Sequence, residues 1–133
     1  MTTINIKNKV LNKRFFQLAK RASLESNEGK YRIGCVIVKN GNPITFGWNK
    51  YNKRHTLCEK YGNQYNAIHA ELDAIIGTDR NTLIGSTIYV YREDRNGQLG
   101  MCRPCNMCMS VLKQYGVKKV YYTHSEGFSY EKI

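Results

Sequence analysis

Residues 86–91 read STIYVY, and residues 104–122 read PCNMCMSVLKQYGVKKVYY. The first stretch alternates in polarity, as a half-buried strand does. The second combines a helical stripe over 105–115, ended by Gly116, with the β-rich run Val117–Tyr122. A strand, a crossover helix and a second strand make a βαβ unit, in which the two strands are parallel. These stretches therefore predict an α/β fold.

The part of the chain before this unit adds a helix and a hairpin. Apolar residues at helical spacing over 11–22 have Lys and Arg on the other side of the predicted helix. The β-branched run 33–38 and the shorter run 44–47 flank Asn40-Gly41, a pair typical of a tight hairpin turn.

The middle of the chain predicts a long loop and another helix. Residues 49–66 are polar and aromatic without a clear period, and residues 67–77 carry an apolar helical stripe that ends at a glycine. The order is helix, hairpin, helix, strand, helix, strand. Because no repeat or Pro-rich linker divides the chain, we expect a single domain over 1–133.

The net charge of +11, from 21 Lys and Arg against 10 Asp and Glu, is large for 133 residues. It favours phosphorylated or polyanionic partners, although a generic solvated basic surface would have the same charge. No apolar run is long enough to span a bilayer, and the first residues lack the apolar segment of a signal peptide. We expect a cytoplasmic protein without a membrane partner.

Two short motifs carry the candidate chemistry: His69-Ala70-Glu71, and Pro104-Cys105-Asn106-Met107-Cys108. Five cysteines cannot all pair in one chain, so metal binding or catalysis is favoured over a disulfide scaffold. Imidazole and thiolate are the ligands that zinc prefers, and Cys105 and Cys108 are spaced to share one helix face.

His69, Cys105 and Cys108 are therefore the predicted ligands of a Zn²⁺ cofactor. Three protein ligands leave a fourth position for water, which is typical of a catalytic zinc site. Glu71 follows His69 closely enough to move protons to and from that water. A structural zinc site made by Cys58, Cys102, Cys105 and Cys108 is the alternative, and it leaves His69-Ala70-Glu71 unexplained.

With these motifs the chain resembles the cytidine and deoxycytidylate deaminase superfamily, which includes the tRNA adenosine deaminases. The likeness covers roughly residues 34–122 and is closest in form to phage-type deoxycytidylate deaminases. It implies a three-layer α/β/α sandwich with a mixed five-stranded sheet. It also implies that Asn49 contacts the substrate sugar or phosphate and that the backbone of Ala70 contacts the base.

Three further residues are expected near the substrate. Arg54 in the basic loop is expected to bind a 5′-phosphate, and Pro104 is also expected to contact the substrate. Arg103 stands where tRNA adenosine deaminases have Glu, and two interpretations are open for it: a phosphate ligand, or the partner of a surface carboxylate. The resemblance also implies a homo-oligomer.

The remaining candidates have simpler interpretations. Cys35 is expected to be a buried core thiol, Cys102 a neighbour of the site, and His124 a surface residue beyond the last strand. Cys58 is expected to be a loop thiol, with a metal role beside His55 as the alternative.

Three functions are weighed. The first is zinc-dependent hydrolytic deamination of a free cytosine nucleotide such as dCMP. The second is deamination of cytosine or adenine within RNA or single-stranded DNA, for which the basic charge and interleaved aromatic residues argue. The third is a non-catalytic, zinc-stabilised nucleic-acid-binding module, and Glu71 argues against it.

Overall fold

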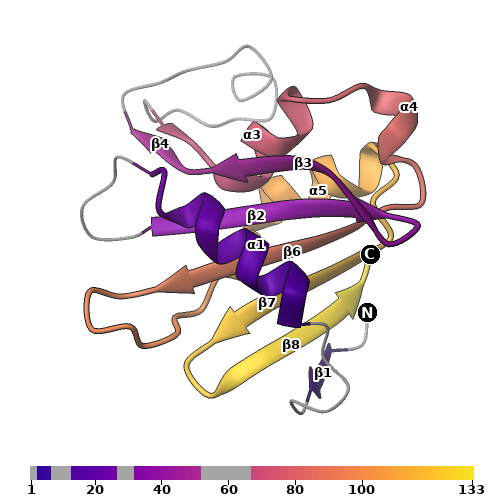
Figure 1. Ribbon diagram of the computed structural model, residues 1–133. Helices are drawn as coiled ribbons and strands as arrows, with labels where there is room; N and C mark the ends of the chain where they lie inside the picture. The colour runs from indigo at the N-terminus through magenta and orange to yellow at the C-terminus, as the bar shows by residue number, and fades with distance from the viewer. Residues whose placement is uncertain (1–2, 7–12, 27–31, 52–66) are drawn as a thin grey trace.

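The computed structural model of the protein describes residues 3–6, 13–26, 32–51 and 67–133. In chain order the elements are β1 (Thr3–Ile6), α1 (Lys13–Ser23), β2 (Arg32–Lys39), β3 (Asn42–Trp48), β4 (Lys50–Tyr51), β5 (Ala67–Ile68), α3 (Ala70–Ile76), α4 (Arg80–Leu83), β6 (Thr87–Glu93), α5 (Asn106–Gln114), β7 (Lys119–His124) and β8 (Gly127–Lys132). The main sheet has the strand order β1-β8-β7-β6-β2-β3 (Figure 1).

The five strands from β8 to β3 form a mixed sheet of the kind expected from the sequence, and β1 extends it as a sixth strand. Strands β6 and β7 are parallel and are connected through α5, which confirms the predicted crossover. Every other neighbouring pair in this sheet is antiparallel. The β2–β3 hairpin turns at Asn40 and Gly41, whose φ angles of 53° and 78° are those that an Asn-Gly turn requires.

Helices cover both faces of the sheet. In Figure 1, α1 crosses in front of β2 and β6, whereas α3 and α5 lie behind the sheet. The core on the α1 side contains Phe15, Phe16, Val36 and Tyr89, among others. The core on the other side is larger and joins α3 and α5 to alternate residues of β2, β6 and β7. Because side chains alternate along a strand, each central strand contributes to both cores.

Two glycines on neighbouring strands allow these helices to approach closely. A Cβ atom on Gly34 would lie 2.2 Å from the carbonyl oxygen of Ala19 in α1, and one on Gly47 would lie 2.1 Å from the carbonyl oxygen of Ala70 in α3. The two glycines face opposite sides of the sheet. The position of α3 against β3 therefore depends on Gly47 having no side chain.

The structure corrects two predicted boundaries. The helix expected from residue 67 starts at Ala70, because Ala67 and Ile68 form β5 and pair with β4. The chain also has a strand beyond the run 117–122: β8 pairs antiparallel with β7, whose own end is His124. His124, expected beyond the last strand, lies within β7 and is half-buried, with its Nε2 atom covered.

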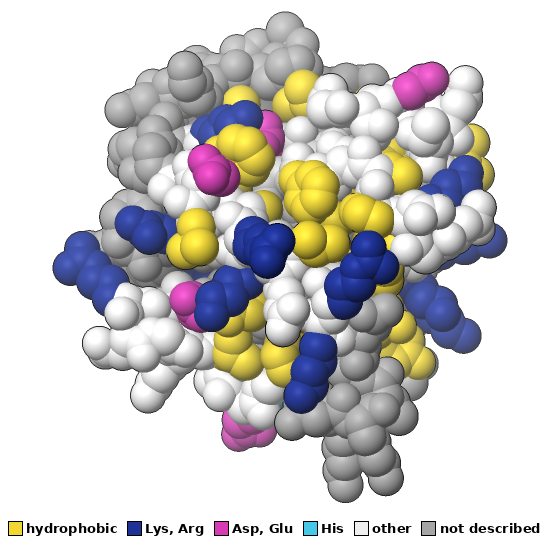
Figure 2. All heavy atoms as spheres, viewed as in Figure 1, with side chains coloured by type: hydrophobic (Ala, Val, Ile, Leu, Met, Phe, Trp, Pro, Cys, Tyr) yellow, Lys and Arg dark blue, Asp and Glu magenta, His cyan; other side chains and the backbone are white. Residues whose placement is uncertain are grey.

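The surface that faces the viewer in Figure 2 is basic. Lys and Arg side chains are distributed over it with few Asp or Glu among them, in agreement with the net charge of +11. In the described part of the chain, no helix is long and apolar enough to span a membrane.

Candidate metal centre

His69 lies at the start of α3. It is the N-cap residue, with an extended backbone (φ −68°, ψ 151°), and directly follows β5. The pairing of β5 with β4 fixes the direction from which the chain enters the helix. The imidazole is therefore placed by a strand on one side and by a helix on the other.

Cys105 and Cys108 lie at the start of α5. Cys105 is the N-cap residue, and its sulfur accepts a hydrogen bond of 3.5 Å from the backbone N–H of Cys108. Cys108 lies in the first turn and is fully buried, whereas Cys105 is exposed. This arrangement favours a thiolate at Cys105, because the N–H groups and the dipole at a helix start stabilise negative charge.

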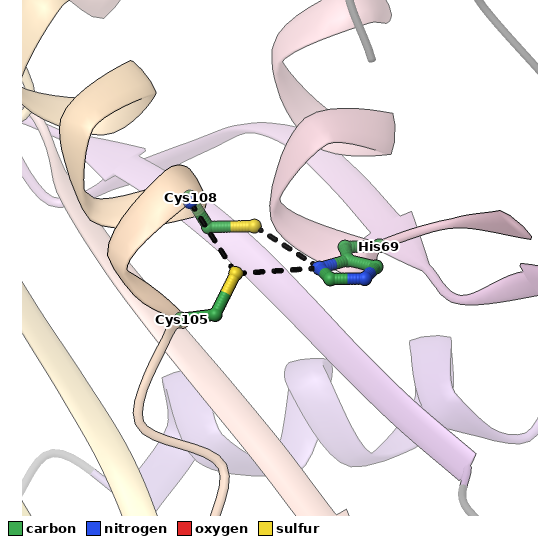
Figure 3. A group of neighbouring side chains, drawn as sticks. All are labelled: His69, Cys105 and Cys108. Atoms are coloured by element: carbon green, nitrogen blue, oxygen red, sulfur yellow. Dashed lines mark hydrogen bonds between the residues drawn. The ribbon is translucent and has the colours of Figure 1, made fainter. Parts of the chain in front are cut away.

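The three predicted ligands come together. Their ligand atoms all lie within 4.8 Å of one another (Figure 3). His69 Nδ1 is 3.3 Å from Cys108 Sγ and 3.7 Å from Cys105 Sγ, so one ring nitrogen faces both sulfurs. One imidazole nitrogen and two sulfurs converging in this way match the donor set of a zinc site. Zinc is accordingly the cofactor that this centre fits.

The ionisation of the two cysteines differs. Hydrogen bonds from Cys108 and His69 lower the pKa of Cys105 to about 4. The hydrogen bond that Cys108 makes with Cys105, together with burial, raises the pKa of Cys108. Cys105 is therefore the sulfur that ionises more readily, and Cys108 would have to lose its proton to bind a cation.

Glu71 lies in the first turn of α3, one helical residue after Ala70, and is only 5 % exposed. Burial raises its pKa above the ordinary carboxylate value, although the nearby His69 acts in the opposite direction. The Cys108 side chain also lowers the pKa of Glu71, by less than His69 does. A buried carboxylate beside the ligands, with a raised pKa, has the properties of a general acid and base.

The other cysteines that the structure describes lie apart from this group. Cys35 is fully buried and donates its thiol hydrogen to the Ala70 carbonyl oxygen at 3.2 Å, which confirms the predicted core thiol. Cys102 is buried and contacts Thr123 Oγ1 at 3.1 Å rather than the metal group. The sequence interpretation of Cys102 as a neighbour of the site agrees with this position.

In the structure, Asn49 and Ala70 both make contacts with neighbouring segments of the protein. Asn49 Oδ1 accepts a hydrogen bond of 3.0 Å from the Ile33 N–H, and its own N–H donates to the Ile33 carbonyl at 3.1 Å. Asn49 thereby fastens the chain that follows β3 to the start of β2. Ala70 is buried, and its carbonyl oxygen faces Gly47 and Cys35.

Arg103 and Pro104 are both engaged within the protein. The Arg103 guanidinium pairs with the Glu131 carboxylate of β8, with Nη2 3.1 Å from Oε1 and Nε bonded to Oε2. Of the two interpretations left open by the sequence, the structure shows the carboxylate partner, and that carboxylate is buried rather than at the surface. Pro104 is fully buried. Arg54, His55 and Cys58 lie outside the described residues.

Sequence reasoning missed two acidic residues around the centre. Asp73 of α3 accepts hydrogen bonds from Lys50 Nζ at 2.8 Å and from the Trp48 N–H at 3.2 Å, and so connects α3 to β3 and β4. Glu131 is the second. Its signal was the alternation of the run GFSYEK over 127–132, which predicts a strand with Ser129 and Glu131 on one face.

Comparison with known proteins gives one family. The model of the family described as the cytidine and deoxycytidylate deaminase zinc-binding region matches residues 9–124. A probable deoxycytidylate deaminase of Caenorhabditis elegans is 35 % identical over 124 residues, which cover 82 % of this chain and 55 % of the nematode protein. The deoxycytidylate deaminase of Mycobacterium phage D29 is 27 % identical, with coverage of 81 % and 90 %. The chain thus spans about half the length of the nematode relative and most of the phage one.

Solved structures agree on the fold. The dCMP deaminase of cyanophage S-TIM5, in its apo form, aligns with a TM-score of 0.60 and 26 % identity over 88 % of this chain and 84 % of that one. The cytidine deaminase of Burkholderia pseudomallei aligns with a TM-score of 0.66 over 92 % of each chain, at 18 % identity, and supports the fold alone.

Proposed function

Because the chain belongs to the cytidine and deoxycytidylate deaminase family, we propose that it is a zinc-dependent hydrolytic deaminase of a cytosine nucleotide, with dCMP as the substrate. The observation that carries the proposal is the meeting of His69, Cys105 and Cys108 beside the buried carboxylate of Glu71. A purely structural zinc site has no use for such a carboxylate.

His69, Cys105 and Cys108 are the proposed metal ligands. When bound, zinc supplies a Lewis acid that lowers the pKa of a water molecule and makes a nucleophile available at neutral pH. The larger core joins α3 and α5 to the same face of the sheet and holds the two helix starts together, so the ligands need little rearrangement to bind the ion.

Glu71 is the proposed proton carrier. Its carboxylate takes a proton from the attacking water and gives it to ring nitrogen N3 as the new C4–O bond forms. It then transfers the second proton from the added hydroxyl to the exocyclic amine as the C4–N bond breaks. A cytosine nucleotide and one water molecule thus become a uracil nucleotide and ammonia.

The choice of dCMP rests on the relatives and on charge. The nematode and phage relatives are named deoxycytidylate deaminases, and the net charge of +11 suits a phosphorylated substrate. Within this proposal the Ala70 backbone contacts the base, Asn49 contacts the sugar or phosphate, and Arg54 binds the 5′-phosphate.

The test is ammonia release from zinc-loaded protein supplied with deoxycytidine, CMP, dCMP, dCTP, adenosine and a short single-stranded oligonucleotide. We expect dCMP to be turned over. We expect Glu71→Gln, which keeps the shape of the side chain but cannot accept a proton, to lower kcat by about 10²- to 10⁴-fold with zinc retained. Glu126→Gln, at an exposed glutamate of the β7–β8 turn, is the matched control and should be as active as the wild type.

Two results would refute parts of this proposal. Equal activity of Glu71→Gln and wild type would remove Glu71 from the chemistry. Turnover of the oligonucleotide alone would replace the free nucleotide by a polynucleotide substrate. The expected homo-oligomer is checked on the same preparation by light scattering coupled to gel filtration, where a monomeric mass would refute it.

A further inference from the structure

The segment that delivers Cys105 to the metal centre is a short connection after β6. It is fastened to neighbouring strands by backbone hydrogen bonds: Gly100 N–H donates to the Arg92 carbonyl at 3.0 Å, and Cys102 N–H donates to the Thr123 carbonyl at 3.1 Å. These bonds fix the segment up to Cys102. Arg103 and Pro104 then connect it to Cys105, the N-cap residue of α5.

Arg103 is fixed by its side chain. Its guanidinium makes two hydrogen bonds to Glu131, and the Tyr122 hydroxyl donates a third to Glu131 Oε2 at 2.9 Å. The Glu131 side chain is only 3 % exposed, whereas the Arg103 side chain is 35 % exposed. The pair therefore reaches from the surface into the protein and ends on a carboxylate of the last strand, β8.

Because Glu131 is buried and Arg103 is partly exposed, Glu131 determines where the Arg103 side chain lies. A buried carboxylate that lost its cation would be strongly destabilised, so Glu131 keeps Arg103 in place. A planar guanidinium bonded through two nitrogens also has a defined orientation, which a single contact does not provide. Arg103 lies two residues before Cys105, and the buried Pro104 between them has a restricted φ angle. Little freedom remains in the backbone that leads to the Cys105 sulfur.

We propose that Arg103 is a positioning residue of the metal centre: held by Glu131 and Tyr122, it fixes the backbone that presents Cys105, and so β8 sets the affinity of the centre for zinc. The inference rests on the zinc chemistry of the proposed function. It gives Arg103 a role in the protein itself, in place of one on the substrate phosphate.

The test measures zinc affinity directly, by competition with a coloured chelator, on protein that circular dichroism shows to be folded. We expect Glu131→Gln and Arg103→Gln each to weaken zinc binding by about tenfold, the lower end of what removing an outer partner of a metal site costs. Arg103→Gln leaves the buried Glu131 carboxylate without its cation, so the double variant Arg103→Gln/Glu131→Gln, which leaves no lone buried charge, provides a folded protein if Arg103→Gln alone does not fold. Because the two residues act as one unit, the double variant should bind zinc no more weakly than whichever single variant has the lower zinc affinity.

Glu93→Gln is the matched control. Glu93 ends β6, accepts a hydrogen bond of 2.7 Å from the Tyr91 hydroxyl and pairs with Lys20 at 3.7 Å. It therefore also accepts from a tyrosine and pairs with a cation, but its cation comes from α1 and not from the segment before Cys105. Zinc affinity within about twofold of wild type is expected for this variant. A role of the Arg103–Glu131 pair in general stability alone would leave the zinc affinity of every folded variant unchanged, and this result would overturn the proposal.

A second readout separates positioning from substrate binding. If Arg103 bound the 5′-phosphate, Arg103→Gln would raise KM for dCMP, spare deoxycytidine and leave zinc affinity intact. That outcome would also overturn the proposal. The zinc measurement needs no substrate, so loss of zinc affinity in a chain that fails to deaminate dCMP would refute the proposed substrate and leave the role of Arg103 supported.

Discussion

Replacing Gly47 by Ala should damage the metal centre by displacing α3, the helix that packs directly against Gly47 of β3. The added Cβ atom would lie 2.1 Å from the Ala70 carbonyl oxygen and 2.6 Å from the Ala74 nitrogen. Both are backbone atoms of α3, so no flexible side chain can move away instead. The contact with Ala70 is about 1.3 Å shorter than the 3.4 Å at which ordinary contact begins.

A shift of α3 by about this distance moves both His69 and Glu71, because one is its N-cap and the other lies in its first turn. Overpacking of this kind costs about 1–3 kcal/mol of stability. Misplacing a catalytic group by about 1 Å can lower the rate by about 100-fold. We therefore expect Gly47→Ala to fold, to bind zinc more weakly and to lose about two orders of magnitude in kcat.

Gly34→Ala is the control that isolates the geometry. Its Cβ atom would lie 2.2 Å from the Ala19 carbonyl oxygen and 2.2 Å from the Ser23 nitrogen, an equal clash with a helix on the other face. It displaces α1, which carries none of the proposed ligands. The assays are urea denaturation for the free energy of unfolding, chelator competition for zinc affinity, and ammonia release for kcat.

The comparison of the two variants tests the reasoning. Both variants should lose similar amounts of unfolding free energy. Only Gly47→Ala should also lose zinc affinity and kcat by more than this loss of stability explains. Equal losses of zinc affinity in the two variants would show that the centre responds to general destabilisation and not to the position of α3.

Three further predictions concern the interior. The thiols of Cys35 and Cys102 should resist iodoacetamide at pH 8 while the protein is folded, since burial raises the pKa of both, that of Cys102 to about 12; mass spectrometry should find them labelled only after denaturation. Burial also raises the pKa of the Tyr89 hydroxyl from 10.0 to about 12, so the stabilisation that comes from keeping this hydroxyl protonated is complete below pH 10 and is lost as the pH rises towards 12. Tyr89→Phe should therefore reduce the loss of unfolding free energy at alkaline pH, measured by urea denaturation. An unchanged pH dependence of stability in this variant would contradict the prediction. Leu112→Ala, at a fully buried position of α5, should lower the free energy of unfolding by about 2–5 kcal/mol, whereas Lys113→Ala at its exposed neighbour should change it by less than about 0.5 kcal/mol.

Much of this protein was predictable from local sequence. The Asn40-Gly41 pair predicted the hairpin because few residues adopt the positive φ angles that the turn needs. The crossover between β6 and β7 followed from a change of hydrophobic period within one stretch of chain. His69, Cys105 and Cys108, which the structure brings together, were predicted as ligands because zinc accepts few ligand types and each motif stands at the start of a predicted helix.

Other features depend on contacts between residues distant in sequence. Ile68 fits a helical stripe, yet it lies in a strand because the chain at Lys50 pairs with it. The roles of Gly34 and Gly47 depend on which helix reaches each face of the sheet, and neighbouring residues do not reveal this. The choice between a phosphate and a carboxylate as the partner of Arg103 was open for the same reason: the partner, Glu131, lies 28 positions away on a strand whose pairing with β7 places its carboxylate beside the guanidinium. Local patterns determined most of the elements and which residues are predicted to bind zinc, whereas tertiary packing decided how those residues are oriented, because orientation depends on the charges and steric contacts that distant segments bring together.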